Sequence, residues 1–194
     1  MFHRPLILAS TSPYRRELLG RLALPFQVES PGVDELGMAG ELPPARAARL
    51  ARDKALAVAR RHPSAVVIGS DQVAALDARL LEKPGNAERC RAQLDSLSGK
   101  GALFHTACAV IGLDAGIDLA HTDTTRVVAR ALTGEEIDRY IEREQPFDCA
   151  GGFKAESLGI ALFDRIETTD PTALVGLPLI WLAGALRRAG YAVP

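Results

Sequence analysis

The sequence predicts an α/β protein with a central mixed, twisted sheet flanked by helices. Short apolar runs bounded by glycine or proline alternate along the chain with longer helical segments, which is typical of this class. Two strand-like runs at 102–112 and 122–131 are separated by Asp114-Ala115-Gly116, and a turn there predicts a hairpin that makes the sheet mixed. The 194 residues suffice to bury a sizeable core, and we expect a single domain over 1–194.

The first elements are predicted from an apolar run and a capping signal. Residues 6–9 are all apolar and are followed at once by hydroxyl residues, so we expect a short buried strand. Ser12 suits the N-cap of a helix with Pro13 at its first position, because proline lacks the N–H that this position leaves unpaired. A strand is expected at 27–29, leading into a Ser-Pro-Gly turn.

The middle of the chain contains two predicted helices around a predicted strand. Residues 43–61 are rich in Ala and Arg and have no interior breaker, which predicts a long helix. The continuous apolar run at 65–68 predicts a buried strand, and residues 73–76 either extend it or begin its partner. Residues 86–97 are expected to form the second helix, closed by Ser98-Gly99.

The last elements follow the hairpin. Thr133 and Glu136 have the spacing of a capping box, which predicts a helix that ends near Glu144. A Gly-rich stretch then precedes a predicted strand at 160–166. The final helix is expected at 179–189, where a glycine follows.

The composition excludes several classes of protein. The formal net charge is −1, without the surplus of Lys and Arg that a nucleic-acid-binding surface requires. The three cysteines, Cys90, Cys108 and Cys149, are widely spaced and odd in number, which favours neither a disulfide framework nor a zinc site. The apolar run near the N-terminus is too short for a secretory signal or a membrane span. We therefore expect a cytoplasmic protein without a membrane partner.

The opening strand-turn-helix is a candidate phosphate site. The N-terminus of a helix presents unpaired N–H groups and the positive end of the helix dipole. Ser10, with the two hydroxyl residues that follow it, adds donors, and Arg15 and Arg16 add guanidinium groups that bind phosphate bidentately. The alternative is that Ser-Pro only caps the helix and that the two arginines are solvated.

Two further charged residues stand at unusual places. Asp71 follows a predicted buried strand, and ligands of open α/β sheets bind at the carboxyl ends of strands; the alternative is an aspartate that begins a turn. Lys54 falls on the apolar face of its helix, beside Leu50 and Val58. Such a lysine either extends to the surface or serves a site.

Other charged residues complete the set. Glu35 follows a Pro-Gly turn, Lys83 precedes Pro-Gly, and Lys154 and Glu156 follow the Gly-rich stretch. Hydrolysis of a phosphoanhydride requires cations that bind the phosphates, acids that bind a divalent ion, and one carboxylate that activates water. These residues supply all three.

At these residues the chain resembles the Maf family of nucleoside triphosphate pyrophosphatases over nearly its full length. The matching motifs are Leu-Ile-Leu-Ala-Ser-x-Ser-Pro-x-Arg-Arg at 6–16, Val-Asp-Glu at 33–35, Lys54, Ser-Asp-Gln at 70–72, Glu-Lys-Pro at 82–84, Ala-Gly-Gly-Phe-Lys-x-Glu at 150–156 and Val-Gly-Leu-Pro at 175–178. The resemblance implies hydrolysis to a monophosphate and diphosphate with a divalent cation, Mg²⁺, Mn²⁺ or Co²⁺. It also implies an elongated two-lobed fold, similar to that of inosine triphosphate pyrophosphatases, with a cleft, which often forms a homodimer.

Carried over to this sequence, the resemblance assigns a role to each candidate. Asp71 is the expected proton acceptor for the attacking water, and Glu35 and Asp71 are the expected metal ligands. The residues expected to hold the triphosphate are Ser10, Arg15, Arg16, Lys54, Lys83 and Lys154.

Three positions are expected to select the base, and here they are Tyr14, Gln72 and Glu156. This set resembles the branch that acts on 7-methyl-GTP, yielding 7-methyl-GMP and diphosphate and so removing a modified nucleotide from the pool. A 7-methylguanine base is positively charged, so an aromatic face and a carboxylate suit it. Tyr14 stands where this branch commonly has Trp, so a weaker stacking face is expected.

Two alternatives stay open at this point. One is a pyrophosphatase for dTTP and UTP, or one of broad specificity. The other is a nucleotide-binding regulator linked to septum formation, with which the family name is associated. The combination of Asp71 with the lysines favours an enzyme over a protein that only binds.

Overall fold

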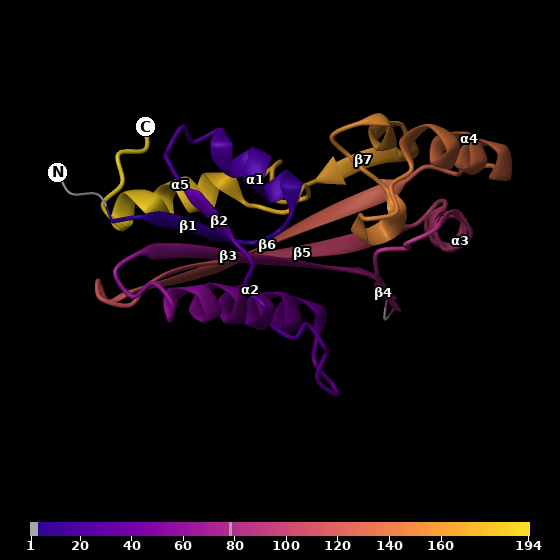
Figure 1. Ribbon diagram of the computed structural model, residues 1–194. Coiled ribbons are helices and arrows are strands. Elements are labelled where there is room, and N and C mark those ends of the chain that lie inside the picture. The colour runs from indigo at the N-terminus through magenta and orange to yellow at the C-terminus, as the bar shows by residue number, and fades with distance from the viewer. Residues whose placement is uncertain (1–3, 78) are drawn as a thin grey trace. The chain divides into compact units, whose positions relative to one another are not determined.

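The computed structural model describes residues 4–77 and 79–194 of the protein. Its strands are β1 (Leu6–Ala9), β2 (Gln27–Glu29), β3 (Val66–Leu76), β4 (Arg79–Leu81), β5 (Gly101–Gly112), β6 (Ile117–Ala129) and β7 (Phe163–Glu167). Its α-helices are α1 (Pro13–Gly20), α2 (Pro43–Ala59), α3 (Ala87–Leu97), α4 (Gly134–Glu144) and α5 (Leu179–Arg188), and two short 3₁₀ helices are η1 (Ala150–Gly152) and η2 (Leu158–Leu162) (Figure 1).

The strands form one mixed sheet, which confirms the predicted fold class. The order of six of its strands is β2-β1-β3-β5-β6-β7. The short strand β4 pairs with β3 and stands outside this linear order. β1 is parallel to both β2 and β3, whereas β3–β4 and β6–β7 are antiparallel pairs. The predicted hairpin is formed by β5 and β6, which are neighbours in the sheet.

The chain forms two compact units. The first comprises the segments up to Asp71, Thr106–Asp123 and from Asp170 onward; the second comprises Gln72–His105 and Thr124–Thr169. The long strands β3, β5 and β6 each contribute residues to both. The expectation of a single domain over 1–194 stays a prediction.

In the first unit, helices cover both faces of the sheet. Leu6 and Leu8 of β1 pack in one apolar cluster with residues of α1 and α5. Ile7 and Ala9 point to the other face and pack with Val58 and its neighbours on α2. Figure 1 shows α1 and α5 on one side of the strands and α2 on the other. A strand buried on both faces requires a continuous apolar run, which is why residues 6–9 are all hydrophobic.

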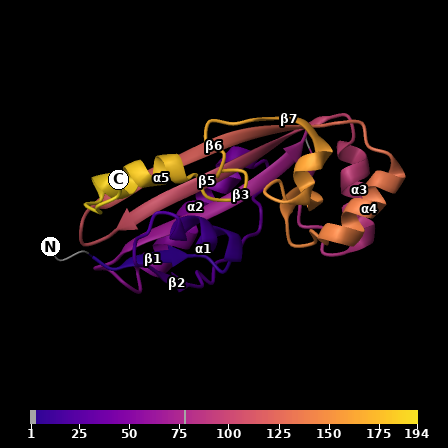
Figure 2. The ribbon, with the colours of Figure 1, turned by 90° about the horizontal axis from the view of Figure 1, so that it is seen from above.

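In the second unit, α3 and α4 pack against each other (Figure 2). α4 begins with the predicted capping box, in which Thr133 and Glu136 each bond to the other's backbone N–H. The ring of Phe153 makes edge contacts with those of Phe104 and Phe163, with centroids 5.3 and 4.7 Å apart. These rings anchor the Gly-rich stretch to β5 and β7.

One predicted strand begins later than expected. Residues 158–162, which include the start of the predicted strand at 160–166, form η2, and β7 begins at Phe163. The backbone N–H of Leu158 donates to the Glu144 carboxylate, and that of Ile160 donates to the carbonyl of Ser157. These bonds hold the chain in a turn, because the same groups cannot also pair in a sheet.

Within residues 4–77 and 79–194, no helix combines the length and the apolar character needed to cross a membrane.

Candidate active site

The carboxyl end of β1 leads directly into the N-terminus of α1. Ser10 follows the last residue of β1 and has only 4% of its surface exposed. Ser12 is the N-cap, and its side-chain oxygen accepts from the N–H of Arg15 at 3.4 Å, while its own N–H donates to Ser10 Oγ at 3.1 Å. This arrangement places a helix N-terminus beside a strand end, which is a geometry that attracts anions.

Lys54 and Asp71 form a buried ion pair in the first unit. Lys54 Nζ lies 2.6 Å from Asp71 Oδ1, and their side chains are 6% and 9% exposed. Glu35 Oε1 lies 2.7 Å from the same nitrogen, but the Glu35 side chain is 58% exposed. Because a lone charge is costly to bury, Lys54 and Asp71 each depend on the other, whereas Glu35 connects the pair to solvent.

Close packing of α2 on β3 brings this pair together. A Cβ atom at Gly69 in β3 would collide with the carbonyl oxygen of Ala51 and would lie 2.6 Å from the backbone nitrogen of Ala55. Only glycine therefore lets the helix backbone approach the strand this closely. Lys54 lies on the buried side of the same helix, as the helical pattern predicted, and reaches Asp71 two residues along the strand.

The position of Asp71 corrects one prediction. Asp71 lies inside β3, not after it, because residues 73–76 extend the strand and residues 74–76 pair with β4. The pairing of β1 with β3, however, ends where Ala9 lies opposite Gly69. Asp71 thus lies just beyond the carboxyl end of the neighbouring strand, at the edge where ligands of open α/β sheets bind.

Arg15 belongs to the same group of charges. Its Nε donates to the carbonyl oxygen of Gly176 at 2.8 Å. Burial lowers the pKa of Arg15 from its ordinary value, and the negative charges of Asp71 and Glu35 oppose this shift. Burial also raises the pKa of the nearby Cys108 to about 12, so this thiol is neutral near pH 7. A guanidinium stays charged in proteins, and Arg15 therefore keeps a positive charge beside the two carboxylates.

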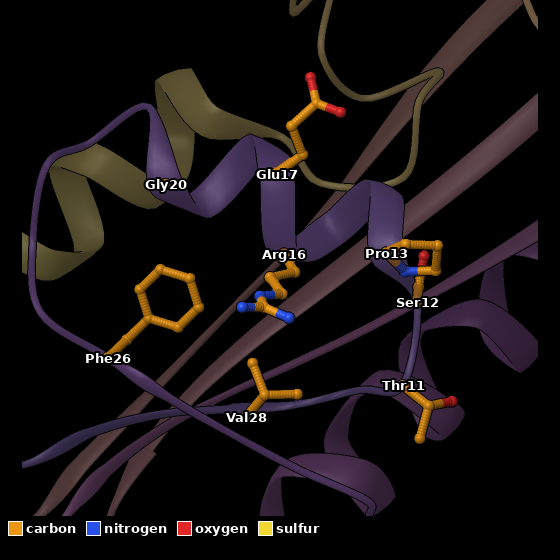
Figure 3. Close-up of a pocket in the computed structure, with 8 residues that line it drawn as sticks. All are labelled: Thr11, Ser12, Pro13, Arg16, Glu17, Gly20, Phe26 and Val28. Carbon is orange, nitrogen blue, oxygen red and sulfur yellow. The ribbon is translucent and has the colours of Figure 1, made fainter.

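Arg16, the next residue, faces a different space. Its side chain is exposed and lines an open pocket of about 440 Å³ between α1 and β2. Figure 3 shows the guanidinium extending toward Phe26 and Val28. Neighbouring residues on a helix point about 100° apart, so Arg15 and Arg16 leave α1 in different directions. The triphosphate role of Arg16 stays a prediction.

The loop that carries Glu35 is held by two arginines of α2. Arg46 donates to the carbonyl oxygen of Glu35 at 3.0 Å, and Arg49 donates to that of Leu36 at 3.1 Å. Arg49 also bonds both carboxylate oxygens of Glu41, at 2.6 and 2.8 Å. Hydrogen bonding from Arg49 lowers the pKa of Glu41 to about 2. The Glu41 carboxylate is therefore charged at neutral pH, and its ion pair with Arg49 persists there.

Lys154 lies in a tightly constrained turn of the second unit. Its backbone N–H donates to the hydroxyl of Tyr140 at 3.0 Å, and its Nζ lies 3.7 Å from Glu144 Oε1. Glu144 also accepts from Ser157 Oγ at 2.8 Å and from the N–H of Leu158 at 3.0 Å. One carboxylate of α4 therefore fixes the turn on both sides of Glu156.

The remaining candidates are Lys83, Gln72 and Glu156 in the second unit and Tyr14 in the first. Lys83 and Glu156 are exposed, while Gln72 and Tyr14 are half-buried. Pro84, which follows Lys83, lies against Gly152 of the Gly-rich stretch. Gln72 follows Asp71 in β3, so their side chains leave opposite faces of the sheet.

The structure thus places the candidates in two groups, one in each unit. The first contains Ser10, Arg15, Glu35, Lys54 and Asp71, and the second contains Lys83, Lys154 and Glu156. Several residues that hold the candidates in place have no predicted role: Ser70, Gly176, Arg49, Tyr140 and Glu144. Two of them carry a signal in the sequence, because Ser70 lies in the Ser-Asp-Gln motif and Gly176 in the Val-Gly-Leu-Pro motif.

Comparisons with known proteins identify similar chains and a matching family model. The family model described as Maf-like protein matches residues 5–189. A protein of Xanthomonas axonopodis pv. citri named 7-methyl-GTP pyrophosphatase is 56% identical over 97% of this chain and 98% of its own length. One of the same name from Polaromonas sp. is 55% identical over 98% and 87%. The solved structure of the Staphylococcus aureus Ham1 protein is 16% identical, with a TM-score of 0.45, over 65% of this chain and 72% of that chain.

Proposed function

Because the chain belongs to the Maf family, we propose that it hydrolyses 7-methyl-GTP to 7-methyl-GMP and diphosphate and so removes a modified nucleotide from the pool. The names of relatives that match it over nearly the whole chain support this substrate. The observation that carries the proposal is the buried carboxylate of Asp71, held by Lys54 at 2.6 Å. A cytoplasmic reaction and a homodimer both stay predictions.

In the proposed reaction, Asp71 is the general base. A water molecule attacks the α-phosphorus of the nucleotide and transfers a proton to the Asp71 carboxylate. The bond from the α-phosphorus to the oxygen that bridges to the β-phosphorus breaks, and its electron pair leaves with diphosphate. Lys54 and Arg15 place positive charge beside the reacting group, where charge on the phosphate oxygens must be stabilised.

The residues present also suit a divalent cation. Glu35 and Asp71 both contact Lys54 Nζ, at 2.7 and 2.6 Å, so two carboxylates converge on one point. Mg²⁺ is commonly held by one or two carboxylates together with substrate phosphates. Among residues 4–77 and 79–194 no group of three or more His, Cys, Asp and Glu is placed to hold a metal ion. Glu35 and Asp71 would hold Mg²⁺, Mn²⁺ or Co²⁺, which supplies charge neutralisation for the phosphates.

We assign the triphosphate to Ser10 and to the predicted cations Arg15, Arg16, Lys54, Lys83 and Lys154. Ser10, Arg15 and Lys54 lie near Asp71, and Arg16 lies on the next face of α1. Lys83 and Lys154 are the corresponding cations of the second unit. Guanidinium and ammonium groups form charge-assisted hydrogen bonds to phosphate oxygens, which are stronger than bonds between neutral groups.

We assign the base to Tyr14, Gln72 and Glu156. The aromatic face of Tyr14 suits a cationic base, and the Glu156 carboxylate suits its positive charge. Gln72 can both donate and accept through its amide. Glu156 is held by a turn that Glu144 fixes from both sides, which favours a defined position for its carboxylate.

A nucleotide panel tests this assignment. Diphosphate release is measured for 7-methyl-GTP, GTP, dTTP and UTP with Mg²⁺, Mn²⁺ and Co²⁺, using wild type, Glu156→Gln and the exposed control Glu142→Gln. We expect wild type and the control to prefer 7-methyl-GTP. Glu156→Gln is expected to lower the preference for 7-methyl-GTP over GTP about tenfold, because a charge-assisted contact worth about 1.4 kcal/mol is lost.

The outcomes separate the alternatives. Equal or faster hydrolysis of dTTP or UTP by wild type would contradict the base assignment and favour the other substrate class. Binding of nucleotide by wild type without release of diphosphate would contradict the enzyme and favour a regulator.

A further inference from the structure

The motif Val-Gly-Leu-Pro at 175–178 has no role in the reaction described so far. It lies in the segment that precedes α5, in the first unit. The carbonyl oxygen of its Gly176 accepts from Arg15 Nε at 2.8 Å and lies 2.9 Å from Ser70 Oγ. Ser70 is fully buried and precedes Asp71. One carbonyl group thus contacts both the arginine of the site and the residue next to its base.

Arg15 is restricted by this contact. A guanidinium has five N–H donors in a rigid, planar arrangement. When the Nε–H is bonded to a fixed acceptor, the direction of the two terminal amino groups is also fixed. The two terminal amino groups then face an anion in one fixed plane. A mobile arginine would lose side-chain entropy on binding, whereas Arg15 is already ordered.

The turn that carries Gly176 is held by a small hydrogen-bond network. Asp170, which is 3% exposed, accepts from the N–H of Thr172 at 2.9 Å and from that of Ile180 at 2.7 Å. The hydroxyl of Thr172 lies 2.6 Å from Asp170 Oδ1 and 2.8 Å from the carbonyl oxygen of Leu177, and it accepts from the N–H of Leu179 at 2.9 Å. Thr172 therefore bonds to Leu177 within the Gly-Leu-Pro turn and to Leu179 directly after it.

The backbone conformation at residue 176 requires glycine. Its φ is +124°, a conformation that side chains with a Cβ rarely adopt. A Cβ there would also lie 3.4 Å from Arg15 Nε and 3.6 Å from Arg15 Cγ. The backbone geometry and the arginine side chain thus fit each other.

We propose that the segment Asp170–Pro178 is a positioning element, in which Asp170 and Thr172 hold the Gly176 carbonyl so that it directs the Arg15 guanidinium toward the triphosphate. The inference rests on the proposed function for the identity of the ligand. Thr172 and Asp170 are positioning residues, since they act on the phosphate only through Arg15.

A double-mutant cycle tests this coupling, with inorganic tripolyphosphate as the probe and calorimetry as the measurement. Thr172→Val is expected to weaken binding about tenfold in wild type but less than about twofold in the Arg15→Ala background, because interaction energies between coupled residues are of this order. Thr172→Ser, which keeps the hydroxyl, is expected to restore binding. Thr125→Val removes a buried hydroxyl whose Oγ lies 2.9 Å from Thr168 Oγ and serves as the control for stability alone.

The coupling and the proposed function fail in different ways. Equal losses of affinity for Thr172→Val in both backgrounds, or a loss for Thr125→Val as large as that for Thr172→Val, would overturn the positioning role. If Thr172→Val does not fold, Asp170→Asn replaces it in the same cycle. The tripolyphosphate probe measures binding and not hydrolysis. Absence of diphosphate release from nucleotides would therefore contradict the proposed function, while the double-mutant cycle would still measure the coupling between Thr172 and Arg15.

Discussion

Replacing Asp71 with asparagine is expected to reduce diphosphate release by about 10²- to 10⁴-fold, the usual contribution of a general base. Asparagine has nearly the same shape and keeps an oxygen that can accept from Lys54, whose Nζ lies 2.6 Å from Asp71 Oδ1. Glu35, 2.7 Å from the same nitrogen, keeps a counter-charge beside the buried ammonium group, so the fold should persist with only a modest fall in the melting temperature. Steady-state kinetics with 7-methyl-GTP measure the effect on kcat.

The control for this variant is Asp138→Asn. Asp138 is an exposed residue of α4 paired with Arg91 at 2.7 Å, and surface pairs of this kind contribute little. Its activity should equal that of wild type. Retention of hydrolysis by Asp71→Asn within a few-fold of wild type would show that another group accepts the proton.

Replacing Lys54 with methionine is expected to lower the free energy of unfolding by about 3–5 kcal/mol, because it leaves a buried carboxylate without its partner. The Asp71 side chain is only 9% exposed, so water cannot replace the ammonium group. Hydrolysis should fall as well, since the charge beside the base and the phosphates is lost. Urea denaturation followed by fluorescence or circular dichroism measures the stability.

The double variant Lys54→Met with Asp71→Asn separates these two effects. Its neutral amide needs no counter-charge, so part of the lost stability should return while activity stays low. Equal stability of the single and double variants would mean that the Lys54–Asp71 pair is not the source of the destabilisation.

Local patterns predicted much of the fold correctly. Ser12 and Pro13 at the start of α1, and Thr133 with Glu136 at the start of α4, are capping signals that act within a single turn of helix. Lys54 was identified as unusual because a charged residue on an apolar helix face is visible from periodicity alone. The structure confirms its burial, at 5% exposed.

Contacts between distant segments could not be predicted in this way. Gly176 contacts Arg15 through its backbone carbonyl, 161 positions away in sequence. Every residue has a backbone carbonyl, so the residue type does not reveal which one accepts a hydrogen bond. The sequence left open whether residues 65–68 and 73–76 form one strand or two, and in the structure β3 pairs along its length with β1, β5 and β4, so that Asp71 lies inside it. Arg15 and Arg16 are the same residue type. Only the structure shows that Arg15 contacts Gly176 whereas Arg16 lines the pocket between α1 and β2.

The most direct test of this account is to hydrolyse 7-methyl-GTP with the wild-type protein in water that contains heavy oxygen, and to analyse both products by mass spectrometry. Attack of water on the α-phosphorus predicts equal amounts of 7-methyl-GMP and diphosphate, with the heavy oxygen in 7-methyl-GMP and with the reaction nearly abolished in Asp71→Asn. Release of 7-methyl-GDP and inorganic phosphate, or heavy oxygen in the diphosphate, would contradict it.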